Sequence, residues 1–227
     1  LLVLDKPSGM SSNAALQRAK RLFGAAKAGH TGSLDPLATG VLPLCFGEAT
    51  KFSQFLLDAD KGYESTFALG VGTDTADADG AVMAQTSAAH LTEDTVIQAM
   101  ATLTGVIEQV PPMYSAIKQD GVPLYKLARK GVEVERASRE VEIYHIGLLR
   151  TQGDEIDVEV SCSNGTYIRS LADDLGERLG CGAHVAGLRR TQAGMFLEPQ
   201  CVTVETLKKT REAEGLAGLD RLLVPMD

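Results

Sequence analysis

The stretch His30-Thr-Gly-Ser-Leu-Asp35-Pro-Leu-Ala-Thr-Gly40-Val-Leu-Pro-Leu44 carries a single charged residue, Asp35, if His30 is counted as neutral. Pro36 pushes Asp35 away from helical dihedrals, and the surrounding glycines allow turns and close approach of the backbone. A carboxylate among apolar residues is poorly solvated and needs a specific partner to stay ionised. Such a carboxylate can serve as a base or a nucleophile near neutral pH. The alternative for an Asp-Pro pair is an aspartate that caps a turn or a helix.

On either side of this stretch, hydrophobic periodicity and turn residues predict a mixture of strands and helices. The predicted strands are 1–4, 41–44, 61–69, 81–85, 139–151, 155–163 and 184–196, with half a hairpin at 113–118. The predicted helices are 12–23, 48–57, 92–103, 123–130 and 167–179, with another that starts at 203–210. Because the elements show no regular βαβ order, we predict an α+β fold with a mixed, mainly antiparallel sheet and flanking helices.

Composition limits the class of protein. The chain has 227 residues, 44% of them hydrophobic, and a net charge of −8, which argues against indiscriminate binding of phosphates. Charge is unevenly spread: residues 1–30 carry five Lys or Arg against one Asp, whereas residues 76–110 carry five acidic residues and no Lys or Arg. This distribution fits either unrelated solvated faces or a local face for RNA. No apolar run reaches membrane length, and the four scattered cysteines suit a reducing cytosol.

Two segments echo metal sites only in part. Asp77-Ala-Asp79-Gly80 resembles a piece of a calcium loop, but Thr75 and Thr86 stand where carboxylates are needed. Cys181-Gly-Ala-His184 has half of a zinc spacing and no second half nearby. We therefore expect no metal.

Several motifs along the chain form a recognisable series with the Asp35 stretch. They are Leu4-Asp-Lys-Pro-Ser-Gly-Met-Ser11, Gly47-Glu-Ala-Thr-Lys51, Asp60-Lys-Gly-Tyr63, Gly72-Thr-Asp-Thr-Ala-Asp-Ala-Asp-Gly80, Pro112-Met-Tyr-Ser-Ala-Ile-Lys118, Cys162-Ser-Asn-Gly-Thr-Tyr-Ile-Arg169 and Gly180-Cys-Gly-Ala-His-Val185. In type and order they resemble the motifs of the TruB family of pseudouridine synthases. The resemblance covers nearly the whole chain.

The resemblance implies a domain organisation. We expect the pseudouridine synthase catalytic domain at residues 1–210, with a thumb insertion at about 109–140, and a C-terminal segment at 211–227. Many bacterial members continue into an RNA-binding domain of the PUA type. Because this sequence stops at Asp227, where that domain would begin, we expect a truncated chain or a further C-terminal tail, and a tRNA affinity below that of a full-length relative. Because the chain opens on Leu1 without a methionine, we also expect a trimmed N-terminus.

The resemblance also implies an activity: conversion of the uridine at position 55, in the T-loop of tRNA, to pseudouridine, after the base has been flipped out. Asp35 would attack the ribose or the base, or remove a ribose proton. Since the reaction is an isomerisation, no cofactor is implied. The partner is tRNA through its T-stem-loop, and we expect a cytoplasmic monomer that does not bind membranes. A further role as a tRNA-folding chaperone is compatible with this interpretation.

Supporting roles follow by resemblance, each beside a simpler interpretation. Arg169 would neutralise Asp35, since a nearby arginine lowers the pKa of a carboxyl by roughly 1–3 units; alternatively it is a surface arginine. Tyr63 would stack on the flipped uracil, or else pack on a neighbouring strand. Tyr167 is a second stacking candidate, and Leu188 is either an apolar wall or a core residue. His30 would position the RNA target. Lys6 and Pro7 would support the catalytic loop or serve a purely structural purpose.

Two other classes of function stay open at this point. One is a tRNA-binding protein or chaperone whose synthase site has decayed. The other is a hydrolase of N-glycosides that uses Asp35 as its nucleophile and releases uracil. A synthase must keep the base and join it again to the ribose.

Overall fold

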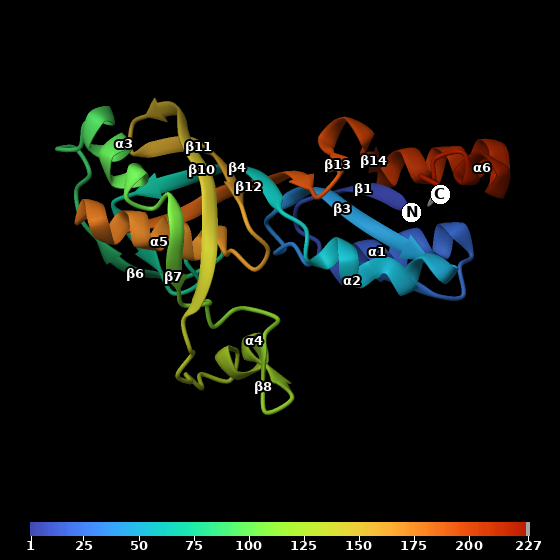
Figure 1. Cartoon of the computed structure of the whole chain (residues 1–227), viewed down its shortest axis with the longest axis horizontal. Helices are drawn as coiled ribbons and strands as arrows, with labels where there is room; N and C mark the ends of the chain where they lie inside the picture. Colours follow the sequence, from blue (N-terminus) through green and yellow to red (C-terminus); the bar gives the residue numbers. More distant parts are fainter. Residues whose placement is uncertain (226–227) are drawn as a thin grey trace. The chain divides into compact units, whose positions relative to one another are not determined.

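The structure is a computed structural model that describes residues 1–225, and the chain forms two compact units. The first unit combines Leu1–Glu64 with Leu188–Asp227, and the second is Ser65–Gly187. In Figure 1 the blue and red ends of the chain therefore belong to the same unit. Two strands, β4 (Lys61–Leu69) and β12 (Ala183–Ala193), contain residues of both units.

The first unit is built around β3 (Thr39–Phe46), which directly follows the Asp35 loop. One neighbour is β1 (Leu2–Lys6), antiparallel to β3, and the other is β12, parallel to it. The remaining strands of this unit are β2 (Ala28–His30) beside β3, β13 (Phe196–Leu197) beside β12 and β14 (Val202–Thr203) beside β1. The sheet is thus mixed, and its core lies on the apolar side chains of β1 and β3, which are almost fully buried.

Two helices of the first unit pack against each other, α1 (Ser12–Phe23) and α6 (Val204–Asp220). The side chain of Ser11 caps α1 by accepting from the backbone N–H of Ala14, and Gly24 ends it with a φ of 62°. A short 3₁₀ turn (Gly47–Phe52) leads into α2 (Ser53–Leu57). No helix within residues 1–225 is long and apolar enough to cross a membrane.

The second unit has the strand order β4, β11 (Glu155–Cys162), β10 (Arg139–Gln152), β7 (Gly105–Gln109). Its helices α3 (Glu93–Ala101) and α5 (Ile168–Leu179) pack on one another, and α3 also contacts β10. A separate small hairpin consists of β5 (Val71–Thr73) and β6 (Val82–Gln85). The core of this unit is made of side chains no more than 3% exposed: Phe67, Val96, Met100, Ile143, Val158, Leu171 and Leu175.

A long excursion, residues 110–138, leaves the sheet of the second unit between β7 and β10. Its two ends lie next to each other because Gln109 pairs with Arg139. It contains β8 (Lys118–Gln119), β9 (Val122–Pro123) and α4 (Leu124–Ala128), and Figure 1 shows it as a green lobe beside the ends of β7 and β10. The excursion occupies the place of the thumb insertion expected at about 109–140, and its role as a thumb stays a prediction.

The α+β fold with a mixed, mainly antiparallel sheet and flanking helices is confirmed. The continuous strand predicted at 184–196 is wrong, because a turn at Gly194, with a φ of 58°, separates β12 from β13. The half hairpin predicted at 113–118 is confirmed only at its end, where Lys118–Gln119 pairs with β9 across the turn at Asp120-Gly121, and residues 113–117 form no strand. The short strands β2, β5, β7 and β14 were not predicted, and the predicted domain end at residue 210 falls inside α6.

Replacing Gly176 of α5 with alanine is expected to destabilise the protein. In most helices this change stabilises by about 0.5–1 kcal/mol. Here a Cβ at position 176 would lie 2.2 Å from the backbone nitrogen of Ala183 and 2.4 Å from the carbonyl carbon of Gly182. We expect the free energy of unfolding in urea to fall by about 1–3 kcal/mol. Gly72→Ala, where a Cβ would meet no atom within 4 Å, serves as the control. A Gly176→Ala protein as stable as the wild type would contradict this contact.

Candidate active site

The Asp35 loop joins β2 to β3 and is fastened on both sides of the aspartate. Before it, the backbone N–H of Leu34 donates to Ser12 Oγ (2.8 Å), which donates in turn to the carbonyl of Leu34 (3.1 Å). After it, the carbonyl of Pro36 accepts from the backbone N–H of Gly9 (2.8 Å). The Asp35 side chain is half-buried. The backbone around the carboxylate is therefore held by residues from the β1–α1 connection and the start of α1.

Lys6 lies beneath this loop and is fully buried. Its ammonium donates to the carbonyls of Pro7 (2.9 Å), Met10 (2.6 Å) and Pro36 (3.3 Å), so all three of its donors have acceptors. Burial lowers the pKa of Lys6 to about 8, while the negative charge of Asp35 acts to raise it. Lys6 thus contacts the loop directly and interacts electrostatically with Asp35.

His30 ends β2, opposite Leu44 of β3. Its Nδ1 is buried and has no hydrogen-bond partner among residues 1–225. Burial lowers the pKa of His30, and the positive charge of Arg190 contributes in the same direction. The ring is therefore neutral at physiological pH, so its interaction with RNA would not be that of a fixed positive charge.

The two apolar candidates of the first unit occupy β4 and β12. Tyr63 is only 9% exposed, so most of its surface is packed against the protein. Leu188 is partly exposed, and its carbonyl accepts from Thr39 Oγ1 at 3.5 Å. Because Thr39 begins β3, this contact connects Leu188 to the end of the Asp35 loop. Leu188 is only partly buried, and its role as an apolar wall stays a prediction.

Arg169, on α5 of the second unit, is 2% exposed, so its interpretation as a surface arginine is wrong. Its Nε lies 3.5 Å from Oδ2 of the equally buried Asp77. Its Nη1 and Nη2 donate to the carbonyls of Thr75 (2.8 Å) and Tyr114 (2.7 Å). Asp77 is therefore a structural partner of Arg169 that the sequence suggested only as part of a calcium loop. A pairing of Arg169 with Asp35 stays a prediction.

Tyr167 is half-buried at the N-terminal end of α5, two residues before Arg169. The side-chain amide of Gln109 bonds to both backbone groups of Tyr167, at 2.7 and 3.1 Å. The guanidinium of Arg139 lies over the Tyr167 ring, 5.7 Å from its centre. Both ends of the 110–138 excursion therefore contact the residue predicted to stack on a base.

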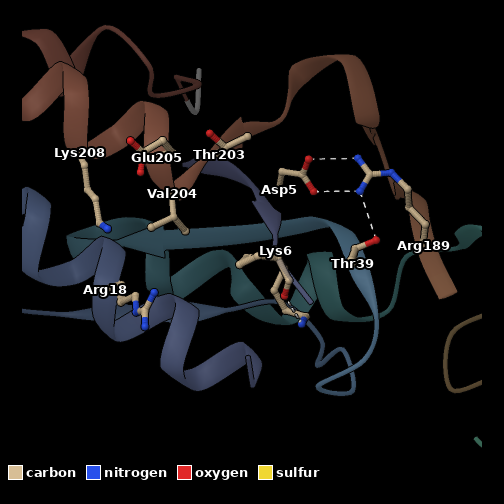
Figure 2. A pocket seen from close by; sticks show the side chains of 10 residues that line it. Asp5, Lys6, Arg18, Thr39, Arg189, Thr203, Val204, Glu205 and Lys208 are labelled. Carbon is tan, nitrogen blue, oxygen red and sulfur yellow. Dashed lines mark hydrogen bonds and ion pairs between the residues drawn. The ribbon is translucent and has the colours of Figure 1, made fainter. Parts of the chain in front are cut away.

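A pocket of about 420 Å³ in the first unit is lined by residues of β1, the first residue of β3, Arg189 of β12 and the start of α6 (Figure 2). Arg189 crosses it to form two bonds with Asp5, at 3.0 and 3.1 Å, and a third with Thr39. The hydrogen bonds that Arg189 donates to Asp5, and to a lesser degree to Glu198, raise the pKa of Arg189. Of the predicted site residues, Lys6 and Pro7 line the pocket, whereas Asp35 and His30 do not.

Comparisons with known proteins decide the family. Residues 20–168 match the model of the N-terminal domain of TruB family pseudouridylate synthases, and residues 169–227 match that of the tRNA pseudouridylate synthase B C-terminal domain. The chain belongs to the TruB family. It is 59% identical over its whole length to tRNA pseudouridine synthase B of Aromatoleum aromaticum, covering 72% of that protein. It is 58% identical to the Pseudomonas aeruginosa enzyme of the same name, covering 74% of it.

The fold of the chain is also similar to that of chains in solved structures. A chain of a Cbf5-Nop10-Gar1 complex is 32% identical, with a TM-score of 0.77 over 99% of this chain. A chain of an H/ACA RNP bound to a substrate RNA containing 2′-deoxyuridine is 30% identical, with a TM-score of 0.69 over 96%. This TruB family member spans 59% and 57% of the lengths of those two chains.

The structure thus brings Lys6, Pro7 and Asp35 together in the first unit, and Tyr167 and Arg169 in the second. Three further residues hold these groups but were missed by sequence reasoning: Asp77, Gln109 and Arg190. Each acts through contacts with residues more than 40 positions away in the chain. Only the match to the family motif around Asp77 could have drawn attention to one of them.

Replacing Asp77 with asparagine is expected to weaken the second unit, because it removes the charge that faces the Arg169 guanidinium at 3.5 Å. Hydrogen bonds to charged groups contribute about 1.5–3 kcal/mol, so we expect the free energy of unfolding in urea to fall by that order. The matched control is Asp79→Asn in the same loop, where the side chain is exposed and a change below about 0.5 kcal/mol is expected. Equal stabilities of the two variants would show that the ion pair contributes nothing.

Proposed function

We propose that this chain converts a uridine of tRNA, the one at T-loop position 55, to pseudouridine. Membership of the pseudouridylate synthase family supports the reaction, and the names of the relatives, tRNA pseudouridine synthase B, support the substrate. One structural neighbour is an H/ACA RNP bound to a substrate RNA that contains 2′-deoxyuridine, which supports an RNA ligand for this fold.

The reaction breaks the N1–C1′ bond of uridine, turns the uracil and joins its C5 to C1′. The proton on C5 is released to water, and N1 gains one, so the product is an isomer. Since no oxidation or group donor is involved, the step requires a carboxylate that can act first as nucleophile or base and afterwards in proton transfer. Asp35 is the residue we assign to this task.

The observation that carries the assignment is the fixation of the Asp35 loop. Ser12 holds the residue before the aspartate, Gly9 and Lys6 hold the residue after it, and the buried ammonium of Lys6 acts electrostatically on the carboxylate. A group held in this way loses little freedom on reaching the reactive geometry, which is what efficient attack on a bound substrate needs. A turn aspartate with no catalytic task would not need a buried cation beneath it.

The base must leave the helical stack before Asp35 can reach it, at a cost of a few kcal/mol. Stacking on an aromatic ring contributes on the order of 1–3 kcal/mol and offsets this cost. We assign Tyr63 and Tyr167 to the flipped base, Leu188 to an apolar wall, His30 to positioning of the RNA and Arg169 to the charge of Asp35. Lys6 and Pro7 support the loop.

We further propose that the protein acts as a monomer in the cytoplasm without a cofactor. Its four cysteines are free thiols, which is the state that a reducing compartment maintains. The isomerisation itself leaves the oxidation level of the substrate unchanged. Light scattering of the purified protein, with and without T-stem-loop RNA, measures the oligomeric state directly.

Asp35→Asn is expected to abolish catalysis while preserving the fold. Removing a catalytic nucleophile lowers kcat by roughly 10⁴-fold or more. The assay follows tritium released from a T-stem-loop labelled at C5 of the target uridine, with Asp79→Asn as the control. A synthase yields labelled water and pseudouridine, a hydrolase yields free uracil, and a protein that only binds or folds tRNA yields neither. Normal turnover by Asp35→Asn would remove Asp35 from the mechanism.

Substitutions at Tyr63 separate stacking from hydrogen bonding by the phenol. Tyr63→Phe keeps the aromatic face and should retain most of the activity, whereas Tyr63→Leu should lower kcat/KM by about 10- to 100-fold, in line with 1–3 kcal/mol of lost stacking. Single-turnover rates on the same labelled RNA measure the difference. Thermal melting of both variants accounts for lost packing, and equal rates at equal folded fractions would argue against a stacking role.

A further inference from the structure

Arg190, on β12 of the first unit, is a buried cation outside the set of residues assigned above. It is 1% exposed and is among the largest fully buried side chains of the protein. Successive residues of a strand point to opposite faces of the sheet, and its neighbour Arg189 reaches Asp5 and Glu198. For Arg190, by contrast, the structure of residues 1–225 records no carboxylate within ion-pair distance.

At one end of the Asp35 loop, Arg190 contacts the first residues of β3. Its Nε donates to the carbonyl of Val41 at 2.7 Å. Its backbone pairs with Gly40, which has a φ of 99°. A Cβ on Gly40 would lie 2.2 Å from the carbonyl oxygen of Arg190, so a residue with a side chain cannot occupy position 40 without moving the two strands apart.

At the other end of the loop, the same guanidinium lies on the side of Gly32 where a side chain would project. Its Nη1 lies 3.6 Å from the place of a Cβ on Gly32, which has a φ of 85°. A single side chain thus bonds to the loop's end at position 41 and lies near its start at Gly32, with Asp35 between them. The loop backbone and the guanidinium form one packed assembly.

Arg190 is not fully satisfied in this place. Its Nη2 is buried and has no hydrogen-bond partner within residues 1–225. A buried donor without an acceptor lowers stability, so the presence of a full arginine here is not explained by stability alone. Buried polar groups that lack a hydrogen-bond partner, and so lower stability, are concentrated at functional sites.

The charge of Arg190 also reaches the groups around the loop. It lowers the pKa of Lys6 and of His30, each less than burial does, and it lowers that of Cys201 against a larger upward effect of burial. The charged groups that act on Lys6 are therefore Asp35, which favours the ammonium, and Arg190, which disfavours it. The Asp35 carboxylate belongs to a group of charges that includes two buried cations.

We propose that Arg190 is a positioning residue for the reaction, which holds the two ends of the Asp35 loop from beneath and so fixes the place of the carboxylate. This inference rests on the proposed function, because it takes Asp35 as the reacting group. Arg190 itself does not touch the substrate, since its side chain is buried under the loop. Its removal should therefore change the chemical step and leave RNA binding intact.

The test compares Arg190→Met, Arg190→Lys and Leu219→Ala by single-turnover tritium release and by equilibrium binding of the same T-stem-loop. Leu219 is fully buried on α6 and outside the Asp35 loop, so its truncation controls for lost stability. A displacement of about 1 Å in a reacting group can lower the rate 10²-fold, and we expect that order of loss for Arg190→Met at an unchanged Kd. Arg190→Lys keeps the charge and a hydrogen-bond donor group but not the planar fork of the guanidinium, and it should recover part of the rate. Leu219→Ala should keep the wild-type rate per folded molecule.

The outcomes separate this inference from the proposed function. A wild-type rate for Arg190→Met, or a rate lowered only in proportion to its folded fraction, would overturn the positioning role while an inactive Asp35→Asn still upheld the function. Weaker RNA binding at an unchanged rate would also overturn it, because Arg190 would then be part of the RNA contact. An active Asp35→Asn would overturn the proposed assignment of Asp35 itself.

A second measurement does not depend on activity and uses two charge-removing variants, Asp35→Asn and Arg190→Met, with Arg190→Gln in place of the latter if Arg190→Met folds poorly. The measurement is the pKa of the Lys6 ammonium, followed by NMR of ¹³Cε-labelled lysine, and we expect a value of about 8 in the wild type because burial lowers it. Loss of the Arg190 charge should raise it, loss of the Asp35 charge should lower it, and Arg190→Lys and Leu219→Ala should leave it in place. An unchanged value in both charge-removing variants would show that Arg190 and Asp35 do not share one electrostatic site.

Discussion

The catalytic arrangement that we propose depends on polar groups that are buried beneath a short loop and hold the backbone on both sides of Asp35. Lys6 and Ser12 are both 3% exposed or less, and each bonds to the backbone of the residue directly after or before Asp35. Burying such groups is costly unless every donor finds an acceptor, and here the acceptors are loop carbonyls, so the cost is offset only when the loop has one conformation. A loop held by apolar contacts alone would tolerate sliding of its backbone. Because the buried side chains of Lys6 and Ser12 need these hydrogen-bond partners, the backbone on both sides of Asp35 is restricted to one conformation.

The second unit uses the same principle with different residues. The guanidinium of Arg169 donates to the carbonyls of Thr75 and Tyr114 and pairs with the carboxylate of Asp77. These contacts connect the loop that contains Thr75 and Asp77, and the segment that contains Tyr114, to α5. The amide of Gln109 does the same for the start of that helix. The five donors of an arginine lie in a rigid fork, which is why one such side chain can fix several backbone segments at once. A lysine at position 169 could charge the site but could not hold these segments in the same geometry.

Helices and strands whose ends are set by neighbouring residues in the chain could be predicted from the sequence. The serine–glycine pair around α1 predicted its ends, and the alternation from Lys61 to Leu69 matched β4 residue for residue. The break between β12 and β13 was missed, because its cause, a left-handed glycine at 194, looks like an ordinary strand glycine in sequence. Family motifs indicated Asp35, Tyr63 and Arg169 as site residues. They did not reveal that Asp77 is the partner of Arg169, or that Arg190 lies under the Asp35 loop. Those are contacts across more than 90 positions, set by strand pairing and packing, and no local pattern encodes them.

A net charge of −8 opposes general attraction to a polyanionic substrate, but the range of electrostatics limits its effect on recognition. At physiological ionic strength the Debye length is about 8 Å, so exposed charges farther than this from a phosphate are largely screened. The charges that act on the RNA are therefore those of side chains that contact it or lie within about one Debye length of a phosphate. Net charge therefore governs weak, indiscriminate attraction, which this chain lacks, and leaves local recognition intact. An enzyme that must select one uridine in one loop benefits from this balance. Binding that does not rely on general attraction to phosphate has to be gained from the shape of the surface that contacts the RNA. In the first unit the buried Lys6 holds the loop of Asp35, and in the second unit the buried Arg169 fixes the start of the helix beside Tyr167, Asp35 and Tyr167 being two of the residues that we assign to the target uridine.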